Sequence, residues 1–311
     1  MDFAVQLENA SKSFGKVQAL KQVSFKVEPG EVIAFLGPNG AGKTTAISLM
    51  MGLRAPDSGT ATIFGRDPRD PQNRSRIGAM LQESDVPSTL KVREVVDFIA
   101  RAYSNPLTVA KALEMADLTD LANRPASNLS GGQKKRLAFA LAVIGNPDVL
   151  FLDEPTAALD VEARRGFWEQ VGTFTRSGKT IILTTHYLEE ADAIAERIVV
   201  INHGEIVTQG TPAAIKARVG GKVMRFKSPR LEAAMLENLP ITRSSINAES
   251  VELYTLEPEH VLRELFNRNV PISDLEVRGG GLEEAFVQIT NSQSQNSGTE
   301  ILAQRQSSPQ A

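Results

Sequence analysis

The chain has 311 residues, of which 41% are hydrophobic and 23% are charged, which is the composition of an ordinary globular protein. Its 34 basic and 37 acidic side chains give a net charge of −3, and this counts against a protein that coats nucleic acid, because phosphate binding usually leaves a basic footprint. The sequence has no cysteine, so disulfides, thiol catalysis and thiolate metal sites are excluded.

The N-terminal segment, residues 3–64, is predicted to form mostly strands. Apolar and polar residues alternate over 3–7 and again over 23–27, which is the pattern of half-buried strands. Residues 31–36 (EVIAFL) form a mostly apolar run that is typical of a strand buried in a parallel sheet. A glycine-rich loop follows, and then a predicted helix over 44–53.

The middle of the chain alternates predicted helices with apolar strands. A helical stretch is expected over 92–121. It is followed by strands and helices in turn, over 149–155, 161–176, 180–184, 188–196 and 197–201. This alternation favours an α/β fold with a parallel sheet, which ends near Thr211 and Pro212.

The C-terminal part predicts a second, smaller unit. Its order over residues 221–289 is βαββαβ, with the first helix at 230–239, and this order indicates a small ferredoxin-like α+β sandwich. The last residues are rich in Gln and Ser and are expected to form a disordered polar tail. The predicted domains are therefore 1–215, 220–290 and, for the tail, 291–311.

No membrane segment is expected in this sequence. Its apolar runs, such as Val149–Leu152 and Ile198–Ile201, are far shorter than the roughly 20 residues that a spanning helix needs. The first residues have no basic region followed by an apolar stretch, so no signal peptide is expected either. We therefore expect no direct insertion into a bilayer.

Residues 37–44 (GPNGAGKT) match the phosphate-binding pattern G-x-x-x-x-G-K-[ST]. Glycines allow backbone amides to curl around a polyphosphate, and the helix that follows points its positive end at the anion. Lys43 is expected to reach the β- and γ-phosphates, and the Thr44 hydroxyl is expected to bind Mg²⁺. A chance match is the alternative, but the predicted strand and helix on either side favour a nucleotide site.

Two carboxylates end the strand at 149–154 (VLFLDE). Strand ends of this kind are where open α/β sheets bind ligands. Asp153 suits a Mg²⁺-organising role, because hard cations take carboxylate oxygens. Glu154 suits polarising or deprotonating a water molecule. The alternative is a helix-capping acid pair before Pro155.

Residues 129–133 (LSGGQ), followed by KKR, could by themselves be only a turn and a helix start. Between a phosphate loop and an acid-ended strand, the sequence over about 3–210 resembles the ATP-binding-cassette (ABC) ATPases. The resemblance implies a P-loop ATPase domain with a parallel core sheet, an N-terminal antiparallel β subdomain and a helical subdomain. The small α+β ferredoxin-like domain would follow it.

The resemblance also implies roles for single residues. Phe14 lies where the family places an aromatic side chain that stacks on adenine, although a strand-edge core residue is the alternative. Gln82 matches the glutamine that contacts Mg²⁺ and the attacking water and links to the membrane partner. Asp160 matches a loop that crosses between subunits, where the family more often has Gly at the position of Ala158. His186 matches the switch histidine at the γ-phosphate.

The remaining side chains that could carry chemistry are interpreted as structural. His203 precedes a glycine in a turn, His260 lies on a polar helix face, and Trp168 is expected to pack within a helix.

The resemblance groups the predicted site residues by role. The catalytic residues would be Lys43, Gln82, Glu154 and His186. The metal ligands would be Thr44, Gln82 and Asp153. The nucleotide contacts would be Phe14, Gly37, Pro38, Asn39, Gly40, Ala41, Gly42, Lys43, Thr44, Thr45, Ser130, Gly131, Gly132, Gln133 and Asp160.

The family's mode of action implies a head-to-tail dimer, a homodimer or a heterodimer, with two ATP molecules and Mg²⁺ between the subunits. The stretch 279–290 (GGGLEEAFVQIT) resembles the ending of exporter subunits, whose permease is a separate integral membrane chain, although a plain amphipathic helix is the alternative. We therefore expect an ATP-hydrolysing export subunit that is cytoplasmic and peripheral on the inner face of the plasma membrane, with no nucleic-acid partner. The alternatives are a soluble ABC ATPase acting on ribosomes or DNA, and a nucleotide-dependent regulator.

Overall fold

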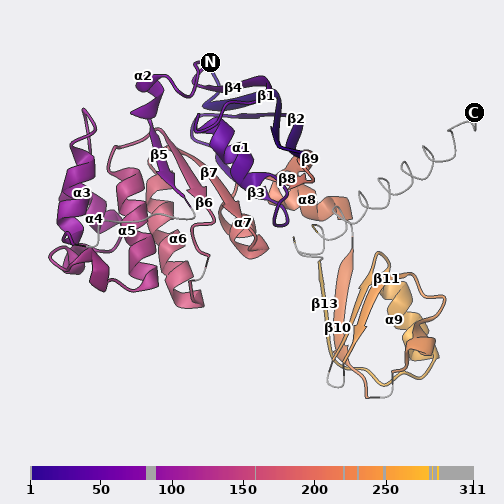
Figure 1. Cartoon of the computed structure of the whole chain (residues 1–311). Helices are drawn as coiled ribbons and strands as arrows, with labels where there is room; N and C mark the ends of the chain where they lie inside the picture. The colour runs from indigo at the N-terminus through magenta and orange to yellow at the C-terminus, as the bar shows by residue number, and fades with distance from the viewer. Residues whose placement is uncertain are drawn as a thin grey trace, which may run out of the picture. The chain divides into compact units, whose positions relative to one another are not determined.

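The computed structural model describes residues 2–81, 89–157, 159–219, 221–229, 231–247 and 250–279, together with Leu282 and Phe286. The chain divides into two compact units, Met1–Pro212 and Ala213–Ala311 (Figure 1). Within the described ranges, none of the helices combines the length and the apolar character that crossing a membrane would require.

The first unit is organised around a six-stranded sheet with the order β5-β6-β7-β3-β8-β9. Neighbouring strands are parallel from β5 to β8, and β9 pairs antiparallel with β8 at one edge. The predicted parallel core sheet is thereby confirmed, with one added antiparallel strand. The strands are β3 (Val32–Leu36), β5 (Ile77–Met80), β6 (Val149–Asp153), β7 (Thr180–Thr185), β8 (Arg197–Asn202) and β9 (Glu205–Gly210).

The three central strands are buried along their whole length and end at the same level. Asp153 of β6 lies opposite Thr184 of β7, and Leu36 of β3 lies opposite Thr185. Because parallel strands share one carboxyl edge, the residues that follow β3, β6 and β7 meet in space. This edge carries the candidate site.

A second, three-stranded antiparallel sheet has the order β2-β1-β4 and confirms the predicted N-terminal β subdomain. Its strands are β1 (Val5–Phe14), β2 (Val17–Val27) and β4 (Ser58–Ile63). β1 and β2 are 10 and 11 residues long, so they are longer than the short strands that the sequence predicts. Their buried residues share a core with α1 (Lys43–Met50), which lies between the two sheets in Figure 1.

Helices cover the large sheet and extend beyond it to one side (Figure 1). The stretch predicted as helical over 92–121 is broken into α3, α4 and a 3₁₀ turn, because Pro106 interrupts it and Thr108 starts a new helix by accepting a hydrogen bond from the Lys111 amide. The helices are α2 (Pro71–Arg74), α3 (Val92–Ala100), α4 (Val109–Met115), α5 (Gly131–Val143), α6 (Val161–Thr175) and α7 (Leu188–Ile194).

The second unit is a four-stranded antiparallel sheet with the order β11-β12-β10-β13, the arrangement of the predicted ferredoxin-like sandwich. Its core includes Met224 and Phe226 of the sheet and Val261 and Leu265 of α9. The elements are β10 (Lys222–Lys227), β11 (Ile241–Ile246), β12 (Val251–Thr255), α9 (Pro258–Asn267) and β13 (Ser273–Gly279), preceded by α8 (Pro212–Val219) at the boundary between the units.

One predicted helix of this unit is wrong. Of the predicted range 230–239, the structure describes residues 231–239, and these hold only a 3₁₀ turn, Ala233–Leu236. Asn238 has a φ of +64°, and Pro240 disfavours the helical conformation of Leu239, so a helix could not extend to the end of this segment. The predicted tail at 291–311 lies outside the described residues.

Candidate functional site

The loop between β3 and α1 depends on two glycines. A Cβ at Gly37 would lie 2.3 Å from the carbonyl oxygen of Ile201, and one at Gly42 would lie 2.6 Å from that of Ala19. Gly42 also has a φ of 109°, a conformation that favours glycine. No side chain caps α1, so its first amide groups are available to an anion.

Lys43 is buried inside this loop, with 5% of its surface exposed. Its Nζ donates hydrogen bonds to the carbonyl oxygens of Gly37 at 2.7 Å and Pro38 at 3.1 Å. Burial lowers the pKa of Lys43, and the negative charges of Glu154 and Asp153 partly offset that effect. The loop therefore holds a cation whose desolvation strengthens its attraction to a phosphate group.

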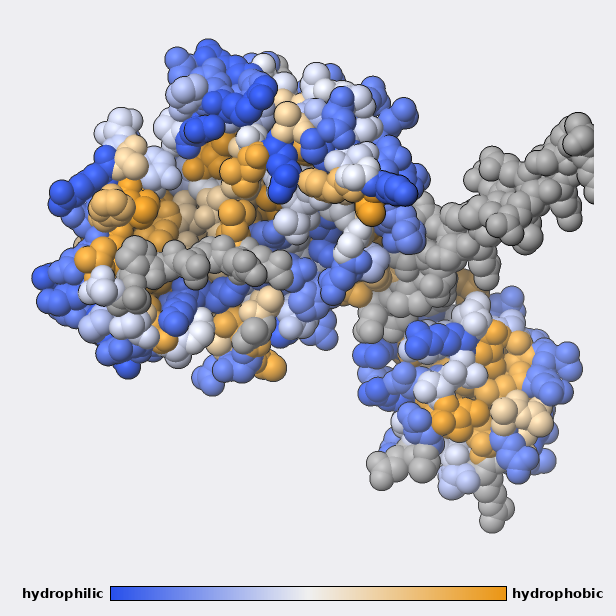
Figure 2. Space-filling model, in the orientation of Figure 1, coloured by the Kyte–Doolittle hydropathy of each residue, from blue (hydrophilic) through white to orange (hydrophobic). Residues whose placement is uncertain are grey.

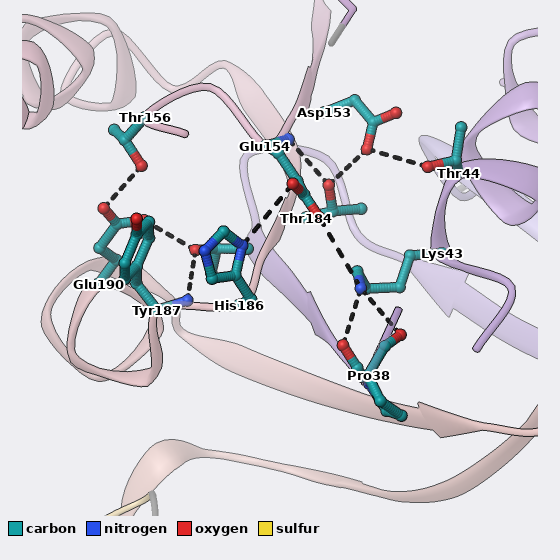
Figure 3. Close-up of polar contacts among 12 residues, drawn as sticks. Pro38, Lys43, Thr44, Asp153, Glu154, Thr156, Thr184, His186, Tyr187 and Glu190 are labelled. Carbon is teal, nitrogen blue, oxygen red and sulfur yellow. Dashed lines mark hydrogen bonds and ion pairs between the residues drawn. The ribbon is translucent and has the colours of Figure 1, made fainter. Parts of the chain in front are cut away.

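Asp153, the last residue of β6, is 1% exposed and faces α1. Its Oδ1 accepts a hydrogen bond from the Thr184 hydroxyl at 2.5 Å, and the Thr44 hydroxyl lies 3.5 Å from the same atom (Figure 3). One carboxylate and one hydroxyl thus converge beside the phosphate loop. Mg²⁺ sites in nucleotide-binding proteins use this kind of oxygen set and complete it with water and phosphate oxygens.

Glu154 follows in a sharply turned backbone conformation. Its φ is +46°, which is uncommon for a residue with a side chain. Its amide donates a hydrogen bond to the Thr184 hydroxyl at 2.9 Å, which holds the turn in place. Because of this turn the Glu154 carboxylate points away from Asp153 and lies between Lys43 and His186 (Figure 3).

The Glu154 carboxylate contacts a basic group on each side. Its Oε1 lies 3.9 Å from Lys43 Nζ, and its Oε2 lies 3.6 Å from His186 Nδ1. His186 follows β7, is 45% exposed at its side chain and packs against the Tyr187 ring, with ring centroids 4.1 Å apart. The helix that comes next, α6, is capped by Asp160 and not by Glu154. This arrangement favours chemistry over helix capping for Glu154.

The LSGGQ segment forms the N-terminus of α5. The Ser130 hydroxyl accepts a hydrogen bond from the Gln133 amide at 3.3 Å, and the Gln133 side chain accepts one from the Ser130 amide at 3.0 Å. A Cβ at Gly132 would lie 3.6 Å from the Leu159 side chain, so this segment lies beside the loop that ends at Asp160. Asp160 in turn accepts a hydrogen bond from the Ala163 amide at 2.8 Å and caps α6.

The remaining predicted residues fall into three groups. Phe14 ends β1 and is 40% exposed, with its ring centroid 5.0 Å from the Arg54 guanidinium. Within the phosphate loop and α1, Pro38, Asn39 and Gly40 are exposed, Ala41 is buried and Thr45 is half-buried; Gly131 is exposed at the start of α5. Gln82 and Ala158 lie outside the described residues.

Sequence reasoning missed two residues that contact or face this site. Thr184 bridges Asp153 and the Glu154 amide, and the signal that could have found it is its place at the end of the strand that pairs with β6. Burial lowers the pKa of Lys135 of α5, and the negative charges of Glu154 and Asp153 partly offset that effect. Lys135 therefore lies in the field of both carboxylates. The basic run after LSGGQ was the only signal for Lys135.

Comparisons with known proteins agree with the geometry. Residues 20–157 match the family model described as "ABC transporter". The chain is 35% identical to a Nod factor export ATP-binding protein of Paraburkholderia xenovorans, over 94% of this chain and 99% of that protein. It is 36% identical to a daunorubicin resistance ATP-binding protein of Streptomyces coeruleorubidus, over 94% of this chain and 97% of that protein.

Solved structures resemble the first unit. A dimeric ATP-binding cassette in a post-hydrolysis state with ADP and Pi is 28% identical, with a TM-score of 0.61, over 67% of this chain and 98% of that chain. A bacterial Atm1-family ABC exporter with ATP bound is 26% identical, with a TM-score of 0.62, over 70% of this chain and 40% of that chain.

Proposed function

The chain belongs to the ABC transporter ATPases, and from this membership we propose that it is the ATP-hydrolysing subunit of an exporter with a separate membrane permease. The observation that carries the proposal is the convergence of Lys43, Asp153, Glu154 and His186 at the carboxyl edge of the sheet, beside the uncapped α1. The full-length relatives, whose names describe export and drug resistance, supply the direction of transport.

Nucleotide binding follows from the phosphate loop. The backbone amides of the loop and of α1 would hold the β- and γ-phosphates of ATP, and Lys43 would leave the loop carbonyls for the phosphate oxygens. Thr44 and Asp153 would hold Mg²⁺ together with Gln82, because their oxygens suit a hard cation. The ion, when bound, neutralises charge on the phosphate oxygens.

Hydrolysis is assigned to the side chains around Glu154. Its carboxylate would accept a proton from the attacking water, since it lies between Lys43 and His186 on the side of the loop where the γ-phosphate would be. His186 and Lys43 would donate to the γ-phosphate oxygens, and Gln82 would orient the water. Phosphoryl transfer needs mainly such positioning and charge neutralisation.

The active unit would be a head-to-tail dimer. Ser130 and the amides that follow it form a helix N-terminus suited to phosphate, but this segment has no counterpart of Lys43 and could not hold a triphosphate alone. Each chain thus supplies two half-sites, and ATP would close the pair. Closure and release would form the two-state switch that a permease uses. A measurement of the dimer would decide whether the pair consists of two identical chains.

The permease would contact the helical side of the first unit. Hydrophobic residues reach the surface there (Figure 2), and Phe98 of α3 is 65% exposed in a groove of about 540 Å³ that Leu90 and Val109 also line. The charged residues Arg93, Glu94, Asp97 and Arg101 also line this groove, so it presents an exposed aromatic ring with a polar rim, a combination that suits a protein partner. We propose that the chain is a peripheral subunit on the cytoplasmic face of the plasma membrane.

Copurification of the tagged full-length chain in mild detergent tests this function. We expect an integral membrane protein to come with it and the complex to hydrolyse ATP. Phe98→Glu should abolish copurification and leave the ATPase activity of the cassette alone unchanged. Leu256→Glu, a control at a 61% exposed position of the second unit, should change neither. Recovery of ribosomes or DNA in place of a membrane protein would favour the soluble alternative, and binding without turnover would favour the regulator.

A further inference from the structure

Glu190 is a buried carboxylate in the third position of α7, and it makes no direct contact with the phosphate loop among the contacts that the structure describes. Its Oε1 accepts a hydrogen bond from the Thr156 hydroxyl at 2.7 Å, and its Oε2 accepts one from the Thr185 hydroxyl at 2.8 Å (Figure 3). Only 5% of Glu190 is exposed. A charge buried to this degree needs partners, and these partners all belong to segments that carry site residues.

The two hydroxyls connect Glu190 to the two ends of the reactive centre. Thr156 lies two residues after Glu154, and Thr185 comes directly before His186. The Thr185 hydroxyl donates its proton to Glu190 and accepts a hydrogen bond from the Tyr187 amide at 2.9 Å. The carboxylate therefore fixes the orientation of the backbone on both sides of His186.

A third connection runs to the start of α6 through Arg164. Its Nε lies 3.4 Å from Glu190 Oε1, and its guanidinium lies 3.7 Å above the Tyr187 ring, which in turn packs on His186. A terminal nitrogen of Arg164 also donates a hydrogen bond to the Leu159 carbonyl at 3.4 Å, directly before Asp160. One ion pair thus reaches the loop that carries Asp160.

We propose that Glu190 is a positioning residue for ATP hydrolysis, holding the Glu154 loop, His186 and the Asp160 loop in register with one another. The inference rests on the proposed function and deepens it. Glu190 acts mainly through His186 and does not touch the nucleotide itself. A purely structural role would stabilise the fold without this connection to turnover.

Glu190→Gln is the direct test, in the full-length chain. Glutamine keeps the shape and one acceptor oxygen, but it turns the other oxygen into a donor that faces a hydroxyl or Arg164. We expect kcat to fall about ten- to a hundredfold, since small misplacements near a reacting centre have effects of this size, while KM for ATP and the unfolding temperature change little. Glu189→Gln, at the exposed neighbouring position, is the matched control and should keep kcat.

A double-mutant cycle with His186→Ala separates positioning from general damage. If Glu190 acts through His186, then Glu190→Gln should lower kcat by less than about threefold once His186 is gone, because coupled residues are not additive. An equal loss in both backgrounds, or an unchanged kcat in Glu190→Gln, would overturn the proposal.

A second variant covers the case in which Glu190→Gln does not fold. Arg164→Gln removes the same ion pair from a side chain that is 23% exposed, and it should lower kcat with KM unchanged. A normal kcat in Arg164→Gln would contradict the proposal. If the unaltered chain hydrolyses no ATP, both the proposed function and the role of Glu190 are contradicted. If the chain is active but Glu190 and His186 are not coupled, only the role of Glu190 is contradicted.

Discussion

Lys43 Nζ and Glu154 Oε1 lie 3.9 Å apart, at the start of α1 and just beyond the end of β6. The Lys43 ammonium also donates to two loop carbonyls, so cation, carboxylate and loop form one polar cluster. A γ-phosphate bound by Lys43 would thus lie within reach of a water molecule that Glu154 polarises. Under the proposed function, binding and hydrolysis would depend on different members of the cluster, and mutations should then separate them.

Glu154→Gln should retain ATP binding and stall hydrolysis. The amide keeps the shape of the side chain but cannot accept the proton of the attacking water, and the loss of a general base lowers the rate by about a hundredfold to ten-thousandfold. Phosphate release at saturating ATP measures the rate. Light scattering after size exclusion should show a dimer that accumulates with ATP.

Glu162→Gln, in the exposed first turn of α6, is the matched control for this prediction and should behave as the unaltered chain does. Full steady-state activity in Glu154→Gln would remove Glu154 from the reaction.

Lys43→Met should weaken ATP binding about ten- to a hundredfold, the range expected for the loss of hydrogen bonds from a charged group. It should also change how stability depends on pH. Burial lowers the pKa of Lys43 below 10.5, so between the lowered value and 10.5 the unfolded chain binds more protons than the folded one. The contribution of Lys43 to the free energy of unfolding therefore rises with pH across that window.

Thermal unfolding without nucleotide, from neutral pH toward 10.5, measures this contribution as the difference between the unaltered chain and Lys43→Met. The difference should shift in favour of the unaltered chain as pH rises, while the ATP affinity of the unaltered chain falls because the ammonium loses its charge. A difference that moves the other way would show that Lys43 does not titrate as a buried cation.

The sequence predicts the phosphate loop and the acid-ended strand because each is a local pattern whose neighbours fix its place. Thr44 and Asp153 come together once the strands that precede them join one parallel sheet. The partners of Glu190 and Thr184 depend on strand register and on the packing of α7, so the sequence offers for Thr184 only its place at a strand end and for Glu190 no signal. The helix predicted at 230–239 is wrong: a 3₁₀ turn stands there, and the positive φ of Asn238 together with Pro240 ends the helical conformation early.

Phe14→Ala should weaken ATP binding about five- to a hundredfold, because base stacking on an aromatic side chain contributes about 1–3 kcal/mol. The ring is 40% exposed, and the Arg54 guanidinium lies over one of its faces, so adenine would stack on the other face or displace Arg54. Isothermal titration measures the affinity. Phe14→Tyr should bind ATP as the unaltered chain does, and inorganic tripolyphosphate should bind equally to all three. Equal weakening for tripolyphosphate would assign Phe14 to the core and not to adenine.

Ser130→Arg should block turnover without weakening the affinity of the monomer for ATP. Ser130 lies at the N-terminus of α5, where a long cationic side chain would obstruct a partner's phosphate loop and oppose the positive end of the helix. The dimerisation of Glu154→Gln with ATP defines two ranges of protein concentration. The ATP affinity of Ser130→Arg is measured in the range where Glu154→Gln is monomeric, and its turnover is measured in the range where Glu154→Gln is dimeric. Ser130→Ala is the control: it removes only the hydroxyl that accepts from the Gln133 amide and should retain part of the activity. A parallel loss of affinity and turnover in Ser130→Arg would place this segment in the same subunit's site and contradict the head-to-tail dimer.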